Sequence, residues 1–195
     1  MNLKIKYNKA LEQKNQLQVE ADKLLLYENF QDFESFFSEV YQQLFQNLFS
    51  YGMQICGNKE LVKDCIQELF SEFWKNQKTL TKIKSVKPYL LKCIKRKIKR
   101  ALGKGKQLYV DGRFEFEMSQ ETKLINDQQQ AREQHLLKKA LKSVTERQRE
   151  AIYLRFYGNL TYEEVAEVLN IRTKAAYKLI YRALSSLKSA VKTSD

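Results

Sequence analysis

Apolar residues recur at three- and four-residue steps along most of the chain. In the first half, this spacing predicts helices over about 30–51, 59–76 and 85–102, because each stretch then presents one apolar stripe. Gly57 interrupts the pattern, and Asn58 is suited to cap the second helix. We interpret the stripes as packing surfaces, and an aromatic binding groove on the first helix is the alternative.

Two capping patterns organise the last part of the chain. Thr145 begins TERQ and Thr161 begins TYEE, so each places a hydroxyl group three residues before Gln or Glu, as in a capping box. We expect helices over about 146–157 and 162–169, followed after a tight turn by a basic helix over about 173–191. A short helix, a tight turn and a longer basic helix predict a helix-turn-helix.

Helical spacing also predicts which side chains face the core. In the first helix these are Phe33, Phe36, Phe37, Val40, Tyr41, Leu44, Phe45 and Leu48. In the last three helices they are Ala151, Ile152, Leu154, Phe156, Val165, Ala166, Leu169, Ala176, Leu179, Ile180, Ala183, Leu184 and Leu187.

Turn residues are scarce, since the 195 residues include 6 Gly and 1 Pro, and this disfavours a fold of many short strands. We therefore expect an all-α protein of two small helical domains joined by a flexible linker. The first domain covers 30–105, the glycine- and glutamine-containing linker 106–129, and the helix-turn-helix domain 130–195. Residues 1–29 form an N-terminal extension of unknown role.

The net charge is +12, from 35 basic and 23 acidic residues, and this favours a polyanionic partner. Basic residues concentrate in 82–106, where eleven occur without an acidic one. Cations crowded on the third helix repel one another, and phosphates would relieve that repulsion, so DNA is the favoured partner. A solvated face and an anionic membrane surface are the alternatives.

Acidic residues form a row on the second helix, where Glu60, Asp64, Glu68 and Glu72 follow one another at four-residue steps. Like charges at this spacing repel by roughly 0.2–0.5 kcal/mol per pair. Asp64 and Glu68 have no obvious local cation to relieve them. The row suggests a basic protein partner, and a solvated face is the alternative.

Several classes of function are disfavoured. No apolar run approaches the 18 residues of a membrane span, and the first residues lack the apolar core of a signal peptide. Cys56, Cys65 and Cys93 are far apart in sequence and His135 is the single histidine, so a zinc site is not expected. The odd number of cysteines and the missing secretion signal indicate a reducing cytoplasm. Because the chain has neither a Ser/His/Asp set nor a phosphate-binding loop, we expect no catalytic site, no metal and no cofactor.

Two segments resemble the sigma factors of bacterial RNA polymerase. Residues 64–74, DCIQELFSEFW, look like their second conserved region. Residues 141–187, with TERQREAIYLRFYGNLTYEEVAEVLNI and YRALSSLK, are similar to their fourth. The spacing and the short linker resemble the extracytoplasmic-function (ECF) class of the sigma-70 superfamily. The resemblance implies a protein that binds the polymerase core, directs it to promoters and helps to open the DNA.

The resemblance also implies roles for particular residues. A basic coiled coil of the largest polymerase subunit would bind Asp64, Gln67, Glu68 and Trp74. The loop 76–87 and the third helix would bind the −10 element through Lys84, Lys87, Tyr89, Lys92, Lys95, Arg96, Lys99 and Arg100. The last helix would bind the −35 element through Arg172, Lys174, Tyr177, Lys178, Tyr181 and Arg182. Many family members are held inactive by an anti-sigma factor, and the resemblance makes such a protein a candidate partner. We also expect the free protein to be monomeric and cytoplasmic, with no small-molecule substrate.

Arg96 departs from the family, which usually has Asn at this position, so base preferences at the −10 element cannot be transferred. Tyr89 either stacks on a base or packs inside the domain.

The alternative function is a helix-turn-helix regulator that does not associate with core polymerase, but this leaves the basic third helix unexplained. An enzyme is the third hypothesis, and the missing catalytic residues disfavour it.

Overall fold

The computed structural model describes residues 31–76, 83–104, 141 and 143–192. These residues form helices and no strand, which confirms the all-α prediction. The elements are α2 (Phe33–Cys56), α3 (Lys59–Lys75), α5 (Val86–Lys104), α7 (Glu146–Ile152), a π-helical turn η3 (Tyr153–Tyr157), α8 (Tyr162–Leu169) and α9 (Thr173–Lys192). The predicted linker and the N-terminal extension lie outside the described residues, and the domain boundaries stay predictions.

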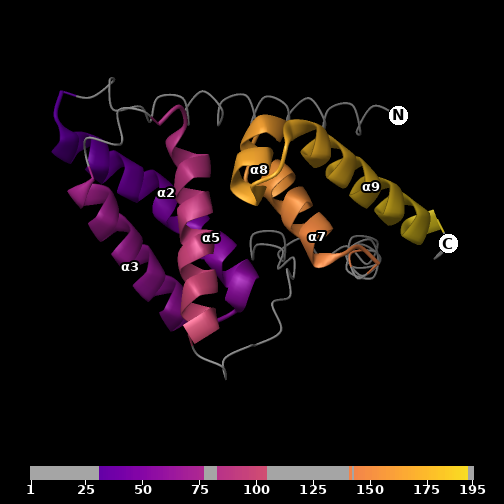
Figure 1. The fold of residues 1–195 in the computed structure, drawn as a ribbon, viewed down its shortest axis with the longest axis horizontal. Coiled ribbons are helices and arrows are strands. Elements are labelled where there is room, and N and C mark those ends of the chain that lie inside the picture. Colours follow the sequence, from indigo (N-terminus) through magenta and orange to yellow (C-terminus); the bar gives the residue numbers. More distant parts are fainter. Residues whose placement is uncertain (1–30, 77–82, 105–140, 142, 193–195) are drawn as a thin grey trace, which may run out of the picture.

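Helices α2, α3 and α5 pack against one another as a three-helix unit (Figure 1). Gly52 of α2 lies where the three helices approach most closely. A Cβ atom at Gly52 would lie 2.7 Å from Cγ1 of Val62 and 3.1 Å from Cδ1 of Ile98. Glycine is a poor helix former, but its missing side chain leaves room for α3 and α5 at this crossing.

The boundary between α2 and α3 follows the sequence closely. Asn58 caps α3, because its side chain accepts a hydrogen bond from the N–H of Leu61 at 3.0 Å, as predicted. Helix α2 continues to Cys56, beyond the expected end near residue 51, because Tyr51 and Ile55 extend its buried stripe. It ends at Gly57, whose φ of 63° is a conformation that glycine adopts without strain.

Both predicted capping boxes are present. The Thr145 hydroxyl accepts the N–H of Gln148 at 3.3 Å, and the Gln148 side chain accepts the N–H of Thr145 at 2.8 Å. Thr161 and Glu164 make the equivalent pair of bonds at 3.2 and 2.9 Å. These bonds satisfy backbone donors that the first turn of a helix leaves free, so they fix where α7 and α8 begin.

The helix that begins at Thr145 does not stay α-helical to residue 157. It becomes the π-helical turn η3, in which the N–H of Gly158 donates to the carbonyl of Tyr153 at 2.9 Å. A π turn contains one more residue than an α turn, so later positions leave the predicted register. Phe156, expected in the core, is 46% exposed for this reason, while Leu154 is fully buried.

Helices α8 and α9 form the predicted helix-turn-helix. Asn170 ends α8 in the left-handed conformation with φ of 53°, and α9 begins three residues later. The buried stripe of α9 runs through Ala176, Ile180 and Ala183. Leu184, also expected to be buried, is 41% exposed, because it lies about 100° further round the helix than Ala183.

Tyr41 is a second aromatic residue whose predicted burial is wrong. It is 43% exposed at the edge of the α2 stripe. Its ring centroid lies 4.8 Å from that of Phe70 and 5.5 Å from that of Phe45, so it packs sideways on neighbouring rings. Helical spacing placed Tyr41 on the apolar side of α2, but α3 and α5 cover only the centre of that side.

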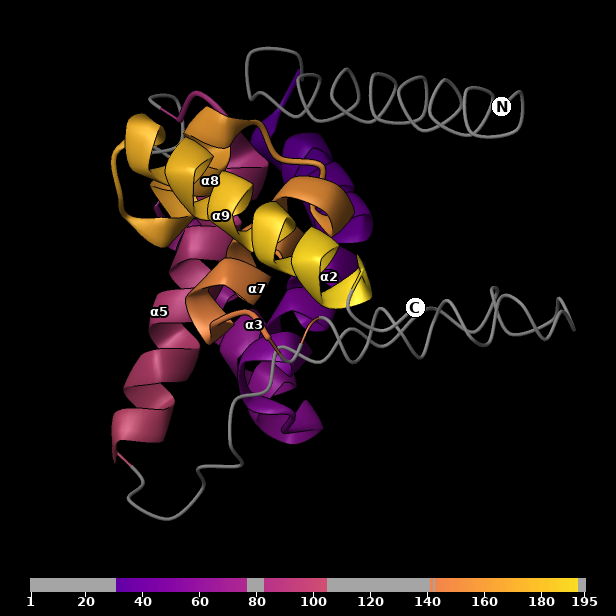
Figure 2. The same ribbon diagram turned by 90° about the vertical axis from the view of Figure 1, so that its right-hand side faces the viewer.

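One hydrophobic core spans both groups of helices. Its buried members include Phe36 and Ile98 from the first group and Leu154, Val165 and Ile180 from the second. Helices α5 and α8 are in contact and lie side by side in both views (Figures 1 and 2). The sequence patterns predict each group of helices, but they do not predict this packing of one group on the other.

Candidate protein and nucleic-acid interfaces

The acidic row of α3 forms an exposed face. Asp64, Gln67 and Glu68 are exposed, and they line a shallow groove together with Ser71 and Glu72. Their spacing of three and four residues places them as neighbours on one side of the helix. The structure therefore brings together three of the four residues predicted to bind polymerase.

Trp74, the fourth, lies apart from the groove. Its ring centroid is 5.2 Å from that of Phe33 and 4.9 Å from that of Phe37, so the indole packs on the end of α2. It is nevertheless 42% exposed. Part of the indole thus stabilises the contact between α2 and α3, and the rest is open to a partner.

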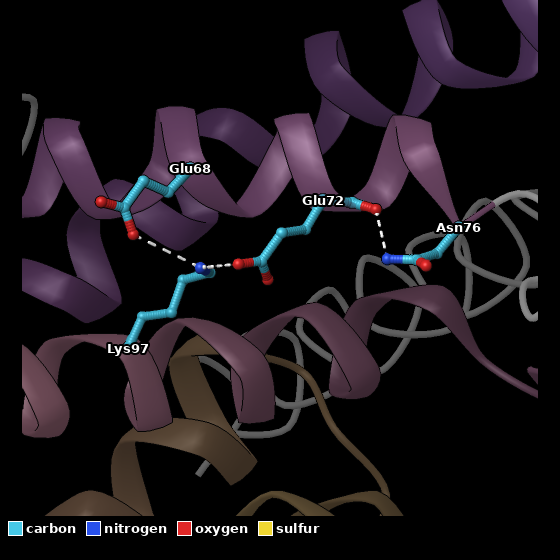
Figure 3. A network of polar contacts seen from close by, with 4 residues as sticks. All are labelled: Glu68, Glu72, Asn76 and Lys97. Carbon is cyan, nitrogen blue, oxygen red and sulfur yellow. Dashed lines mark hydrogen bonds and ion pairs between the residues drawn. The ribbon is translucent and has the colours of Figure 1, made fainter.

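Lys97 of α5 connects two carboxylates of the acidic row (Figure 3). Its Nζ lies 2.6 Å from Oε1 of Glu72 and 3.4 Å from Oε2 of Glu68. Burial lowers the pKa of Lys97, but the hydrogen bonds and charges of both carboxylates outweigh burial, and the net effect raises that pKa. Glu68 therefore has a cation from another helix, which local sequence could not reveal. Within the described part of the chain, Asp64 belongs to no ion pair.

The basic residues predicted to bind the −10 element fall into an exposed and a covered group. Arg96, Lys99 and Arg100 are exposed on α5, as is Lys84 just before the helix. Lys92 is half-buried. The exposed cations are free to approach a phosphate backbone without any change in α5.

Lys87 and Tyr89 belong to the covered group. Lys87 is only 4% exposed, and Tyr89 packs against the hydrophobic core. Burial raises the pKa of Tyr89, and its contact with Cys93 adds to this effect. In this conformation Tyr89 packs against the core and Lys87 is buried, and the predicted contacts of both with DNA stay predictions.

Lys95, the third covered residue, forms a buried ion pair with α7. Its Nζ lies 2.7 Å from Oε1 of Glu150, and the Tyr51 hydroxyl donates to the same oxygen at 2.6 Å. Burial lowers the pKa of Lys95, although Glu150 opposes that shift. Burial, then the charge of Glu150, raises the pKa of Tyr51 well above its usual value. One carboxylate thus holds an ammonium and a phenol from the opposite helical group.

A cleft of about 550 Å³ lies between the two groups of helices. Its lining residues are Lys92, Lys95, Arg96, Lys99, Glu146, Arg147, Glu150, Val168, Leu169 and Asn170. Half of these residues are cations and only two are acids, so the cleft is strongly electropositive.

The residues predicted to bind the −35 element share one exposed face. Lys174, Tyr177, Lys178, Tyr181 and Arg182 are all exposed, at steps of three and four residues along α9. Arg172, in the turn before α9, is exposed as well. The structure therefore brings this predicted set together on the second helix of the helix-turn-helix and the turn just before it.

Tyr177 is held in place on this face by aromatic contacts. Its ring stacks on Tyr162 of α8 with centroids 3.8 Å apart and planes 16° from parallel. The guanidinium of Arg155 lies 5.0 Å from the Tyr162 ring, within range of a cation–π interaction. These contacts fix the orientation of α8 and α9 at the exposed face.

Sequence reasoning missed Tyr51, Glu150 and Lys97 as interacting residues. Glu150 left a weak signal, because it is an acidic residue directly before the apolar pair Ala151 and Ile152. Its partners lie on other helices, so no local pattern could identify them. Among the described residues, no group of side chains could hold a metal ion, and no helix has the length and apolar character of a membrane span.

Comparison with known proteins assigns families to both helical groups. Residues 40–107 match the model of Sigma-70 region 2, and residues 134–187 match the model of Sigma-70, region 4. No curated protein matches the chain. A solved structure, the sigma factor RpoE in complex with the anti-sigma factor NepR from Bartonella quintana, matches with a TM-score of 0.55 and 20% identity. The match covers 80% of this chain and 96% of the RpoE chain, and it supports the same fold.

Proposed function

Since this chain belongs to the sigma-70 family, with the combination of regions 2 and 4 found in its ECF class, we propose that it directs RNA polymerase to particular promoters. In this proposal the chain binds the polymerase core through α3 and promoter DNA through α5 and α9. The observation that carries the proposal is the exposed face of α9, which holds five of the six predicted −35 residues, with Arg172 exposed in the turn just before it.

Helix α9 would bind the −35 element in the major groove. It is the second helix of a helix-turn-helix, and in this motif side chains near the helix start contact base edges. Arg172 and Lys174 lie at that start, and Lys178 and Arg182 follow on the same side. Arginine and lysine donate to guanine in the major groove and also neutralise phosphates, so this face suits both kinds of contact.

Helix α5 would hold the DNA around the −10 element. Arg96, Lys99 and Arg100 offer exposed cations that neutralise phosphates and release counterions. Opening a duplex costs a few kcal/mol for each extruded base, and contacts to the extruded base offset this cost. The segment that would supply such a pocket, residues 77–82, lies outside the described residues, so its part in the proposal rests on the family resemblance.

The exposed carboxylates of α3 would bind the polymerase core. Asp64 has no ion-pair partner among the described residues and Glu68 shares Lys97 with Glu72, so the face stays acidic overall. A basic coiled coil would complement this charge, and Trp74 would add an aromatic contact at the end of the helix. Exposed charges of this kind raise the association rate and orient the partner.

An anti-sigma factor is the remaining proposed partner. The RpoE structure that matches this fold holds an anti-sigma factor, and the match covers 80% of this chain. A protein of this kind would keep the chain from polymerase until a signal releases it. Copurification from the native cell, followed by identification of the bound proteins, would test this part of the proposal.

The central experiment is transcription with purified core polymerase and this protein on promoters bound in the native cell. We expect promoter-specific transcripts only when the protein is added. The double variant Asp64→Arg, Glu68→Arg should lose both core binding and transcription. The control variant Gln42→Arg, at an exposed position of α2, should keep both. Equal activity of all three proteins would contradict docking through α3. Binding of the free protein to a palindromic site as a dimer, without core binding, would instead favour the helix-turn-helix regulator.

A further inference from the structure

The cleft lined by α5, α7 and the end of α8 holds more positive charge than its own carboxylates balance. Ten residues line its volume of about 550 Å³, and five of them are cations against two acids. The ammonium of Lys95 is already paired with Glu150. Only Glu146 is left to balance the other four cations, which are Lys92, Arg96, Lys99 and Arg147.

These four cations are not compensated elsewhere in the described part of the chain. No ion pair among the described residues includes any of them. Burial lowers the pKa of Lys95, against the effect of Glu150, and the charges of Lys99 and Arg147 lower that pKa further. The cations of α5 and α7 therefore lie close enough to repel one another, and a bound anion would relieve this repulsion.

We propose that this cleft binds an anion with a chain of condensed phosphates, such as a nucleoside triphosphate or free polyphosphate. Small-molecule sites usually have volumes of about 300–1,000 Å³, so a small anion fits this cleft, whereas a DNA duplex does not. A cleft lined by one sign of charge also concentrates ions of the opposite sign. The binding site itself is independent of the proposed function, and its effect on promoter DNA rests on that function.

The spacing of the cations favours a chain of phosphates over a single one. Lys92, Arg96 and Lys99 follow at steps of four and three residues, which places them on one face of α5. The first and the last lie about 10 Å apart along the helix axis. An anion that contacts all three must therefore carry charge along its length, as condensed phosphates do. Arg147 lines the same cleft from α7, and its planar guanidinium can donate two parallel hydrogen bonds to a phosphate.

The wall formed by α8 offers contacts for a base. Val168 and Leu169 are the apolar residues of the lining, and Asn170 follows them at the end of α8. Asn170 is exposed, and its amide can both donate and accept hydrogen bonds at the edge of a base. A nucleotide would place its phosphates on α5 and α7 and its base at this wall. Free polyphosphate would use the cations alone, so Asn170 distinguishes the two sources.

The direct test is isothermal titration calorimetry of the whole protein with sodium tripolyphosphate, ATP and GTP, with sodium phosphate as the reference. We expect the condensed phosphates to bind at one site and about tenfold or more tightly than orthophosphate, because each further charged contact adds affinity. A nucleotide that binds more tightly than tripolyphosphate identifies a nucleotide site, and equal or weaker binding identifies a site for free polyphosphate. Affinity for all three no greater than for orthophosphate would overturn the proposal.

Matched variants separate the cleft from general attraction to a basic protein. Arg147→Gln and Lys99→Gln, on opposite walls, should each weaken tripolyphosphate binding about tenfold, as expected for one lost hydrogen bond to a charged group. Arg182→Gln, at an exposed position of α9 outside the cleft, should leave that affinity unchanged. Circular dichroism should show the same helix content in all three. Equal losses in all three would indicate adsorption to the net charge of +12 and would overturn the site.

Asn170→Gly tests the contact with a base. Glycine keeps the left-handed turn at this position, where φ is 53°, but removes the amide. At a nucleotide site this variant should weaken binding of the preferred nucleotide and leave tripolyphosphate binding unchanged. Equal affinity of the variant and the parent chain for that nucleotide would contradict a base at the α8 wall.

An anion in the cleft would compete with promoter DNA for α5. Lys92, Arg96 and Lys99 also belong to the surface proposed to contact the −10 element, so a bound polyphosphate occupies charges that the DNA needs. At an ionic strength held constant with sodium chloride, tripolyphosphate should displace a labelled single-stranded DNA from the free protein. Arg147→Gln should require a higher concentration, and equal displacement from both proteins would overturn the competition. Failure of the sigma assignment would appear separately, as absent promoter-specific transcription with core polymerase while tripolyphosphate still binds.

Discussion

The Tyr51 hydroxyl donates a hydrogen bond of 2.6 Å to Glu150, although 99 positions separate the two residues in sequence. Tyr51 lies in the buried stripe of α2, one turn before Ile55, and Glu150 precedes the apolar pair that α7 buries. The bond joins the two sigma regions at a buried point, where Tyr51 is fully covered and Glu150 is 7% exposed at the edge of the cleft. It makes the stability of the molecule depend on contacts that neither region has alone.

Tyr51→Phe should therefore destabilise the protein. The variant keeps the ring and its stacking on Tyr153 but leaves Glu150 with one donor fewer. A buried hydrogen bond to a charged group contributes about 1.5–3 kcal/mol, and we expect a loss of this size in the free energy of unfolding. Urea denaturation followed by circular dichroism measures it. Tyr41→Phe, at a partly exposed position of α2, is the control. An equal loss of stability in both variants would contradict the role of the hydrogen bond between Tyr51 and Glu150.

Lys97→Met should reduce stability only modestly. The ammonium of Lys97 relieves repulsion between Glu68 and Glu72, but both carboxylates are more than half exposed, at 70% and 61%, so water screens them. Pairs of this kind contribute about 0.2–1 kcal/mol, and less at high salt. Urea denaturation at low and high salt should show a difference that shrinks as salt rises. A loss that does not change with salt would mean that lost packing, not charge, is responsible.

Arg182→Ala and Lys178→Ala should weaken transcription that depends on the −35 element. Each lost base or phosphate contact should cost about 1–3 kcal/mol, which is about fivefold or more in promoter occupancy. Quantitative transcription with core polymerase measures this effect, and circular dichroism should show an intact fold. Lys188→Ala, at an exposed position further along α9, is the control. Full promoter strength in both variants would argue against the assignment of α9.

Promoter affinity of the polymerase holoenzyme should fall steeply with salt. Each neutralised phosphate contributes about −0.9 to the slope of log affinity against log salt, so Lys99→Ala should make that slope about one shallower. Electrophoretic mobility shifts at several salt concentrations measure the slopes. Lys59→Ala, at an exposed position of α3 away from the predicted DNA surface, should leave the slope unchanged. An unchanged slope in Lys99→Ala would contradict phosphate binding by α5.

Cys65 should react with alkylating agents only at high pH. Burial, reinforced by Glu68, raises the pKa of Cys65 from 9.0 to about 11. Since only the thiolate is nucleophilic, its alkylation rate should keep rising up to about pH 11, while an ordinary thiol levels off above about pH 9. Mass spectrometry after pulses of iodoacetamide measures this for each cysteine. Protein unfolded in urea is the control, and early levelling in the folded protein would contradict the raised pKa.

The same pKa has a consequence for stability. Because the folded pKa of Cys65 exceeds its unfolded value, the unfolded chain loses its proton first as pH rises. The contribution of Cys65 is thus complete below about pH 9 and is lost between about pH 9 and 11. The free energy of unfolding should fall in that window, and Cys65→Ala should reduce the steepness of the fall.

Local patterns in the sequence were sufficient for the existence of the helices and for the caps at which three of them begin. Asn58, Thr145 and Thr161 cap helices because their side chains lie close in sequence to the backbone groups that they bind. The same holds for the exposed face of α9, whose members lie at regular steps along one helix. The failures were Phe156, displaced by a π turn, Tyr41 and Leu184, each at the edge of a stripe, and the end of α2, which lies at Cys56.

The sequence by itself determined the helices, their caps, the acidic and basic faces and the family, because each depends on residues within a few turns of one another. Only the tertiary structure decided which charges are available. Lys97 is shared by Glu68 and Glu72, and Lys95 is paired with Glu150, because helices distant in sequence meet there. Charge repeats along a helix are local, but their compensation depends on which helix lies opposite, and that follows from how the whole core packs.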